Sequence, residues 1–300
     1  MIHFNCTKIL IPVDFSDTSL LAIKHGAYIG HSTRAGVYLL HVVSAQYVSQ
    51  NMFLPSVALD QSLIERKATE RLAELAAEVS EEWGVTVQNI VRVGSPSVEI
   101  SKVAKDIGAS IIVMGTHGYS PLENLVIGST ALKVITKSHC PTMAMSAAAE
   151  HRGYNTIVLP IDNTVNSRQK VHFSIEFAKK FDATLHALGL LSNAEGLDRP
   201  AMEVILHQIE TLAKEKGAKY SFEILDHVSN RANATVQYVE KIGGDLIVIM
   251  TDQDAELSGF FLGPYSQQVI HLSKVPVITI KPEDLFVEES ESSIPNTSGS

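Results

Sequence analysis

Short runs of apolar residues alternate with longer amphipathic stretches along most of the chain. Residues 8–14, 37–43 and 110–114 are apolar and rich in Val, Ile and Leu, as in strands buried on both faces of a parallel sheet. Residues 59–83 carry apolar side chains at helical spacing, and Gly84 ends this pattern. Strands that alternate with helices predict an α/β fold with a doubly wound parallel sheet.

The same alternation occurs twice. Residues 156–162 match residues 8–14 after 148 positions, and residues 243–250 match residues 108–115 after 135 positions. A length of 300 residues also suits two domains. We therefore expect a duplicated α/β domain. The expected boundaries are 1–147 for the first domain, 154–282 for the second, and 283–300 for a disordered tail rich in Glu and Ser.

Composition narrows the classes of partner and compartment. A net charge of −9 and a pI near 5.7 argue against nucleic-acid binding, which needs a concentrated basic face. No apolar run reaches the roughly 18 residues of a membrane span, so we expect no membrane partner. Residues 1–8 lack the basic and apolar regions of a signal peptide, and we expect a cytoplasmic protein.

The two cysteines, Cys6 and Cys140, each precede an expected strand. Two cysteines do not make a disulfide framework, and we expect both to be reduced. His3 and His139 could lie at the same end of the sheet as the cysteines, but no Cys-x-x-Cys or His-x-x-x-His spacing supports metal binding. We therefore assign no metal ligand.

A glycine-rich segment follows the apolar run at 110–114. Gly115 and Gly118 come first, and Gly128 precedes Ser129 and Thr130 at the start of an amphipathic helix. Glycine admits close approach of a ligand to the backbone, and unpaired N–H groups at a helix start attract anions such as phosphate. A plain strand-to-helix connection with turn glycines is the alternative, and spacing alone does not separate the two.

In an open parallel sheet, ligands bind beyond the carboxyl ends of the strands where the strand order reverses. Asp14 ends the first strand and could accept hydrogen bonds from ribose hydroxyls or an adenine amino group, or it could simply form a turn or helix cap. Val13, Val42 and Met114 could form apolar walls for a base, although such residues are commonly core. We expect His117 to offer its backbone N–H rather than to act as a base.

The chain lacks the sequence motifs of several enzyme classes. Neither the Gly-x-x-x-x-Gly-Lys-Ser/Thr loop nor the Gly-x-Gly-x-x-Gly fingerprint is present, which disfavours phosphate-loop NTPases and dinucleotide dehydrogenases. No Ser-His-Asp arrangement stands out, and we assign no catalytic residue.

The chain resembles a tandem universal stress protein. The resemblance is carried by Ile-Pro-Val-Asp at 11–14, Leu-His-Val at 40–42, and the spacing of Gly115, Gly118 and Gly128-Ser. It implies a five-stranded parallel sheet of order 3-2-1-4-5 in each domain, and ATP binding, with magnesium, in those members that keep the glycine spacing. Ala131 departs from the pattern, because some ATP-binding members carry a hydroxyl there. The residues implied for the nucleotide site are Pro12, Val13, Asp14, Val42, Met114 and Gly115 around adenosine, and His117, Gly118, Gly128, Ser129 and Thr130 around the phosphates.

The second half keeps little of this pattern. Met250 stands where Gly115 does, Gln253 replaces Gly118, Pro264 replaces Ser129, and Asp252 would add negative charge beside a phosphate. We therefore expect one ATP per chain. The edge strands that begin at Pro141 and Pro276 could pair the two domains, and two chains could form a homodimer.

Three functions remain open at this point. The first is an ATP-binding stress-response or regulatory protein whose nucleotide state is read by a protein partner that the sequence does not identify. The second is a slow ATPase or nucleotidyl hydrolase. The third is an interaction scaffold that binds no nucleotide.

Overall fold

A computed structural model describes residues 2–44, 61–117, 127–149, 153–162, 164–191, 199–251 and 262–282. The expected tail at 283–300 and the predicted site residue Gly118 lie outside these ranges. The elements of the first half are β1 (Lys8–Pro12), α1 (Asp17–Thr33), β2 (Gly36–Ser44), α3 (Gln61–Trp83), β3 (Val87–Gly94), α4 (Pro96–Ile107), β4 (Ile111–Gly115), α5 (Ser129–Lys137) and β5 (Thr142–Met145).

The second half repeats this order, with one interruption in its first helix. Its elements are β6 (Thr156–Ile161), α6 (Val165–Gln169), α7 (Val171–Lys180), β7 (Thr184–Leu190), α8 (Arg199–Glu215), β8 (Lys219–Leu225), α9 (Arg231–Ile242), β9 (Leu246–Met250), α10 (Pro264–Leu272) and β10 (Val277–Ile280).

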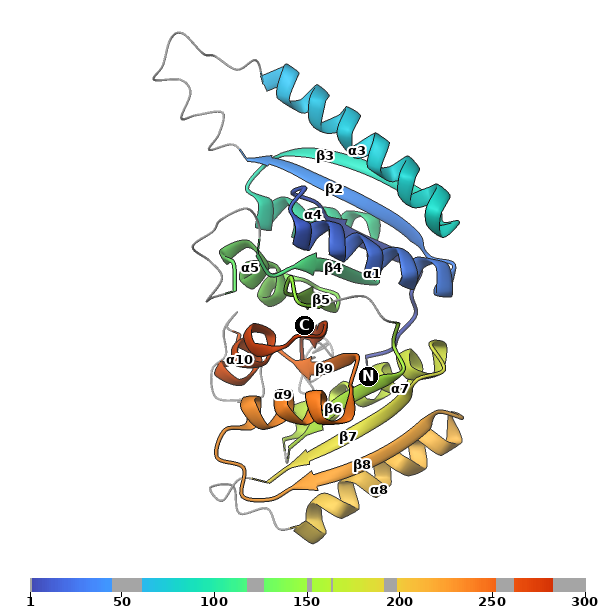
Figure 1. The fold of residues 1–300 in the computed structure, drawn as a ribbon, viewed down its shortest axis with the longest axis vertical. Coiled ribbons are helices and arrows are strands. Elements are labelled where there is room, and N and C mark those ends of the chain that lie inside the picture. Colours follow the sequence, from blue (N-terminus) through green and yellow to red (C-terminus); the bar gives the residue numbers. More distant parts are fainter. Residues whose placement is uncertain are drawn as a thin grey trace, which may run out of the picture.

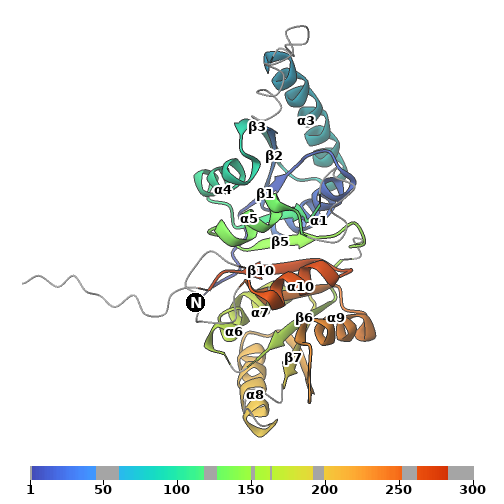
Figure 2. The same ribbon diagram turned by 90° about the vertical axis from the view of Figure 1, so that its left-hand side faces the viewer.

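The described strands form one continuous sheet of order β3-β2-β1-β4-β5-β10-β9-β6-β7-β8. Each half has the predicted order 3-2-1-4-5, and the strands are parallel within each half. The fold class inferred from the apolar pattern is confirmed. The halves join where β5 pairs antiparallel with β10, as Figure 2 shows, so the expected edge-strand pairing is also confirmed.

Successive side chains of β1 enter two different cores, because neighbouring residues of a strand point to opposite faces. Ile9 and Ile11 belong to the core beneath α1 and α3, whereas Leu10 belongs to the core beneath α4 and α5. Figure 1 shows these helix layers on the two faces of the first-domain sheet. This arrangement places the first turns of α1, α4 and α5 at the carboxyl ends of the strands.

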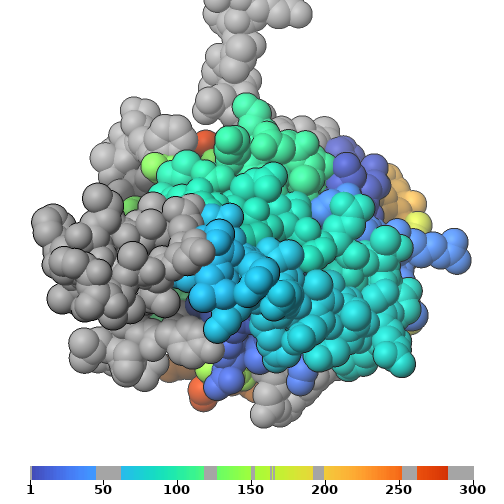
Figure 3. Space-filling view, turned by 90° about the horizontal axis from the view of Figure 1, so that it is seen from above, coloured from blue at the N-terminus to red at the C-terminus, as the bar shows by residue number. Residues whose placement is uncertain are grey.

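Helix α3 forms the outer surface of the first domain, at the end of the molecule away from the second domain (Figures 1 and 3). Its exposed face carries salt-bridged pairs such as Arg71 with Glu74, while Leu72 and Val79 are buried. No helix in the described part of the chain combines the length and apolarity needed to cross a bilayer.

The N-terminal segment of the first half lies against α7 of the second half. The backbone N–H of Phe4 donates to Glu176 Oε2 at 2.8 Å, and the Phe4 ring contacts Phe173 and Phe177. These contacts add to the β5–β10 pairing.

Cys6 and Cys140 are both free thiols, and burial raises the pKa of each.

A buried hydrogen-bond chain ties α1 to the segment that joins the two halves. His25 is 1% exposed, its Nε2 donates to the carbonyl oxygen of Ala149, and its Nδ1 lies 2.9 Å from the hydroxyl of Tyr154. Since Nε2 carries the proton, Nδ1 is the acceptor for the Tyr154 hydroxyl.

Replacing Tyr154 with phenylalanine is expected to lower the free energy of unfolding by about 1–3 kcal/mol, because a buried imidazole nitrogen loses its donor. Chemical denaturation measures this loss. The control is Tyr38→Phe, since the Tyr38 hydroxyl forms no hydrogen bond with the described residues. Equal stabilities of the two variants would contradict the prediction.

Candidate functional site

A cavity of about 270 Å³ lies at the carboxyl ends of β1 and β4, bordered by the first turns of α1, α4 and α5. Ten of the eleven predicted site residues line it, and Gly118 is the one outside the described residues. The predicted residues that line the cavity are Pro12, Val13, Asp14, Val42, Met114, Gly115, His117, Gly128, Ser129 and Thr130. Sequence reasoning did not assign Thr18, Ser19, Leu40, Pro96, Ile100, Thr116 and Ala131, which also line it.

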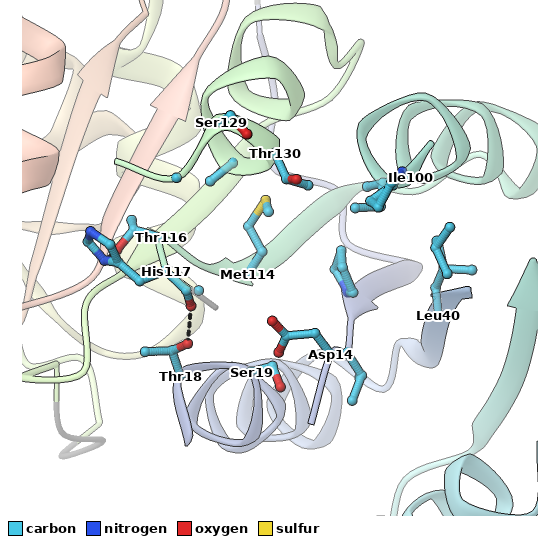
Figure 4. Close-up of a pocket in the computed structure, with 17 residues that line it drawn as sticks. Asp14, Thr18, Ser19, Leu40, Ile100, Met114, Thr116, His117, Ser129 and Thr130 are labelled. Carbon is cyan, nitrogen blue, oxygen red and sulfur yellow. Dashed lines mark hydrogen bonds between the residues drawn. The ribbon is translucent and has the colours of Figure 1, made fainter. Parts of the chain in front are cut away.

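Figure 4 shows how these side chains meet from separate elements. Asp14 and Met114 point toward the same space, with Ser129 and Thr130 on one side and Leu40 and Ile100 on another. The cavity therefore has an apolar end and an end lined by hydroxyl groups. This division suits a ligand with an apolar ring system and a polar or anionic tail.

Asp14 lines the cavity and also shapes the turn into α1. The backbone of Val13 still donates to Leu40 O at 2.8 Å, so the chain stays paired to β2 until this point. Asp14 Oδ1 then accepts from Ser16 N at 3.0 Å and from Ser16 Oγ at 2.5 Å. Ser16 in turn caps α1 by accepting from Ser19 N. The turn interpretation of Asp14 is therefore confirmed, and the exposed side chain also borders the cavity, because the turn uses one carboxylate oxygen.

Gly115 lacks a side chain for a reason that the sequence did not reveal. A Cβ at this position would lie 2.8 Å from both Cβ and Oγ1 of Thr18, and 3.2 Å from the Thr18 carbonyl carbon. The first turn of α1 thus packs directly on the last residue of β4. From the sequence, this glycine was predicted to let a ligand approach the backbone. The structure shows that the close packing of α1 already requires a glycine here.

The chain leaving β4 is held by hydrogen bonds to its neighbours. The Thr18 hydroxyl donates to the carbonyl oxygen of His117, drawn as the dashed line in Figure 4. Thr116 Oγ1 lies 2.8 Å from His117 Nδ1, and the Thr116 N–H donates to Met145 O at 2.8 Å. The ring of His117 is therefore positioned by Thr116.

The start of α5 supplies the polar end of the cavity. Gly128 precedes the helix and makes no side-chain cap, and the first turn contains no acidic residue. The Gly128 N–H donates to Thr116 O at 2.8 Å, so this N–H group is already used within the protein. The N–H groups at 129–131 belong to the first turn, which has no intrahelical acceptor for them. These groups and the hydroxyls of Ser129 and Thr130 can therefore donate to an anion.

The sequence profile of the Universal stress protein family matches residues 5–145 and again residues 153–281. The chain belongs to the universal stress protein family. Its first half is 38% identical over 141 residues to the universal stress protein MJ0531 of Methanocaldococcus jannaschii, covering 46% of this chain and 81% of that protein. A universal stress protein of Mycolicibacterium smegmatis is 23% identical over 286 residues, which span 91% of this chain and 97% of the relative.

The solved structure of a universal stress protein from Archaeoglobus fulgidus has the same tandem fold. The two structures superpose with a TM-score of 0.73 at 22% sequence identity. The superposition covers 95% of this chain and 99% of the Archaeoglobus fulgidus chain. The likeness concerns the fold alone. The chain is thus a tandem universal stress protein, with two copies of the family's domain in one polypeptide.

The second universal stress protein domain has larger side chains at several positions equivalent to the lining of this cavity. Met250, at the position of Gly115, is fully buried. Arg231 stands at the position of Pro96 at the start of α9, and its guanidinium lies 3.5 Å from Asp162 Oδ2. Asp162 is the counterpart of Asp14, and Tyr265 that of Thr130. The Tyr265 hydroxyl lies 3.1 Å from Thr235 Oγ1. Larger side chains and an internal ion pair therefore stand at positions that line the cavity in the first domain.

Lys170 interrupts the helix that corresponds to α1. It stands between α6 and α7 at the position of the buried residue Ala22, and it is itself fully buried. Its Nζ donates to Ser167 O at 2.8 Å and to Ser167 Oγ at 3.1 Å. Burial lowers the pKa of Lys170 to about 8, although the nearby Asp162 carboxylate opposes this shift. The helical pattern of the sequence did not predict this interruption.

Stability should rise with pH because of Lys170. Its pKa is about 8 in the folded chain and 10.5 ordinarily, so the unfolded chain binds more protons between these values. The free energy of unfolding therefore increases across this window, by about 3 kcal/mol from Lys170 alone. Denaturation of the native chain and of Lys170→Met, compared at several pH values, isolates this contribution from other titrating groups. Parallel stability curves for the two proteins would contradict the assignment.

Proposed function

We propose that this universal stress protein is an ATP-binding stress-response or regulatory protein that holds one nucleotide per chain in its first domain. The observation that carries the proposal is the cavity at the ends of β1 and β4, which combines apolar walls with hydroxyls and with the N–H groups of a helix first turn that lack an intrahelical acceptor. Its volume of about 270 Å³ is near the lower end of pockets that bind small molecules. In this proposal the predicted domain limits, 1–147 and 154–282, separate a binding domain from a degenerate one.

Each part of the nucleotide has residues that fit it. Val13, Val42 and Met114 would face the adenine ring, and the free side of Asp14 would accept hydrogen bonds from the ribose hydroxyls. The start of α5, with Ser129 and Thr130, would bind the phosphates, together with the chain at His117 and Gly118. No group of three or more His, Cys, Asp or Glu side chains in the described ranges could hold a metal ion. Magnesium would therefore enter with the nucleotide, coordinated chiefly by its phosphates.

The closed space in the second domain supports a single site. An ATP molecule seated there would have to break the contact between Arg231 and Asp162 and move Tyr265. These costs argue that the second domain has a different role, such as pairing with the first through β10. An unidentified protein partner would read the nucleotide state, and two chains would associate as a homodimer in the cytoplasm.

Native mass spectrometry of freshly purified protein tests the proposal. We expect an adenine nucleotide to remain bound, and titration calorimetry of the nucleotide-free chain to give one ATP per chain. Two equivalent sites would contradict the assignment to the first domain alone. No binding at all would favour a scaffold function, and steady release of ADP with magnesium present would favour a slow ATPase.

A further inference from the structure

Four polar side chains form a connected row in the second domain, far along the sheet from the proposed nucleotide site. They come from β7, β8 and α9, which lie together in Figure 1. Ser221 Oγ lies 2.5 Å from His186 Nδ1, and His186 Nε2 lies 2.5 Å from the Tyr238 hydroxyl. The Tyr238 hydroxyl donates to Glu223 Oε2 at 2.8 Å. The row therefore runs from a serine through a histidine and a tyrosine to a carboxylate.

The carboxylate sets the direction of every hydrogen bond in this row. An ionised Glu223 can only accept, so the Tyr238 proton is committed to it. Tyr238 Oη can then only accept from His186, which places the imidazole proton on Nε2. The remaining nitrogen, Nδ1, carries a lone pair, and the Ser221 hydroxyl donates to it. This is the arrangement in which a histidine can remove the proton of a serine.

The charges of the neighbouring groups favour the same protonation states. The hydrogen bond from Tyr238 lowers the pKa of Glu223, and the Lys241 ammonium, 3.4 Å from Glu223 Oε1, lowers it further. Partial burial lowers the pKa of His186, although Glu223 opposes this shift. At neutral pH, Glu223 is therefore ionised and His186 is neutral, which is the state that a general base requires.

The serine lies where a small molecule can reach it. Ser221 and His186 are both partly exposed, and the Glu223 side chain is 42% exposed. β8 is the last strand of the sheet and pairs only with β7 among the described strands. Alternate backbone N–H groups of β8 therefore face away from β7, along an edge that no described strand covers.

The first domain shows that the fold does not need this row. His186 pairs in register with Ser221, and the equivalent pair in the first domain is Tyr38 with Gln88. Ile90 and Val103 stand at the positions of Glu223 and Tyr238. The duplicated domain thus has the same sheet and helix with none of these four polar groups.

We propose that Ser221 is a base-activated nucleophile that accepts acyl groups from small activated esters. Ser221 Oγ forms a bond to the ester carbonyl carbon while its proton passes to His186 Nδ1. The bond from that carbon to the leaving oxygen then breaks, and His186 returns the proton to the departing alcohol. The products are an acylated Ser221 and a free alcohol, so atoms and charges balance without a further reagent.

The test uses p-nitrophenyl acetate with the full-length chain. We expect a burst of p-nitrophenol of about one equivalent per chain, and peptide mass spectrometry should find the acetyl group on Ser221. Ser221→Ala should abolish this acetylation, and His186→Gln should slow it about 100-fold or more. The matched control is Gln88→Ser, which places a serine at the equivalent first-domain position beside Tyr38, and that serine should stay unmodified.

The pH profile separates a reactive serine from a structural one. The rate of acetylation should follow the neutral fraction of His186 and reach half its maximum below the ordinary histidine pKa. Tyr238→Phe, which keeps the aromatic ring, should lower both the rate and this midpoint, and it serves as the second variant if His186→Gln does not fold. The proposal is wrong if Ser221 is not acetylated, or if its acetylation is insensitive to both His186→Gln and Tyr238→Phe.

Discussion

Replacing Gly115 with methionine is expected to weaken ATP binding at least about 100-fold, or about 3 kcal/mol. A Cβ at this position meets Thr18 at 2.8 Å, so the first turn of α1 has to move. The Thr18 hydroxyl in that turn donates to His117 O, and the cap residue Ser16 donates to Asp14. His117 and Asp14 both border the cavity. Titration calorimetry of the folded variant measures the loss.

The second domain provides the matched control. Met250 occupies the equivalent position, fully buried, in a domain whose corresponding helix is interrupted at Lys170. Met250→Gly should leave ATP affinity unchanged and lower the free energy of unfolding by about 2–5 kcal/mol, because it opens a cavity in the core. Gly115→Met itself should cost about 1–3 kcal/mol through overpacking. ATP affinity that survives in Gly115→Met would show that the nucleotide binds elsewhere.

Removing the buried carboxylate of the second domain is expected to lower the free energy of unfolding by about 3–5 kcal/mol. Asp162 is 2% exposed, lies 3.5 Å from the Arg231 guanidinium, and faces the fully buried Lys170. Its Oδ1 also accepts from Thr164 N at 3.0 Å and from Thr164 Oγ1 at 2.7 Å. Asp162→Ala leaves two cations without their anion and the helix start without its turn. Guanidinium denaturation measures the loss.

Asp14→Ala tests the same sequence position in the first domain and should behave in the opposite way. Asp14 is exposed, and its described role in the fold is the turn with Ser16, so its loss should cost about 1 kcal/mol of stability. ATP affinity should fall, because the ribose loses an acceptor. Equal stability losses for the two variants would contradict the view that one aspartate serves a ligand and the other an internal ion pair.

Much of the candidate site could be predicted because many of its residues lie at the ends of strands. Apolar runs mark the strands, and the residues that follow them must lie at the carboxyl edge of a parallel sheet, as Asp14 and Gly115 do. Thr18 and Ile100 were not predicted. They reach the cavity only because α1 and α4 cross the sheet at particular positions, and their sequence spacing is ordinary for amphipathic helices.

The sequence predicted only part of the difference between the second domain and the first. Met250 and Pro264 were recognised by comparison with the first half, but the contact between Arg231 and Asp162 was not. The two residues are far apart in the chain, and each is unremarkable among its neighbours. Their pairing depends on how closely α9 approaches the end of β6. The break at Lys170 was missed because the surrounding residues keep a helical apolar pattern.

Side-chain pattern alone predicted the alternating strands and helices, the duplicated unit, and the glycine spacing kept only in the first copy. These features are local, since they depend on side-chain period and on the order of residue types. The tertiary structure decided which helix start meets which strand end. It showed that Gly115 leaves room for Thr18. It also showed that, in the second domain, Arg231 contacts Asp162 and Tyr265 contacts Thr235 at positions that line the cavity in the first domain. Such contacts join residues distant in the chain, so they depend on packing distances that no local pattern encodes.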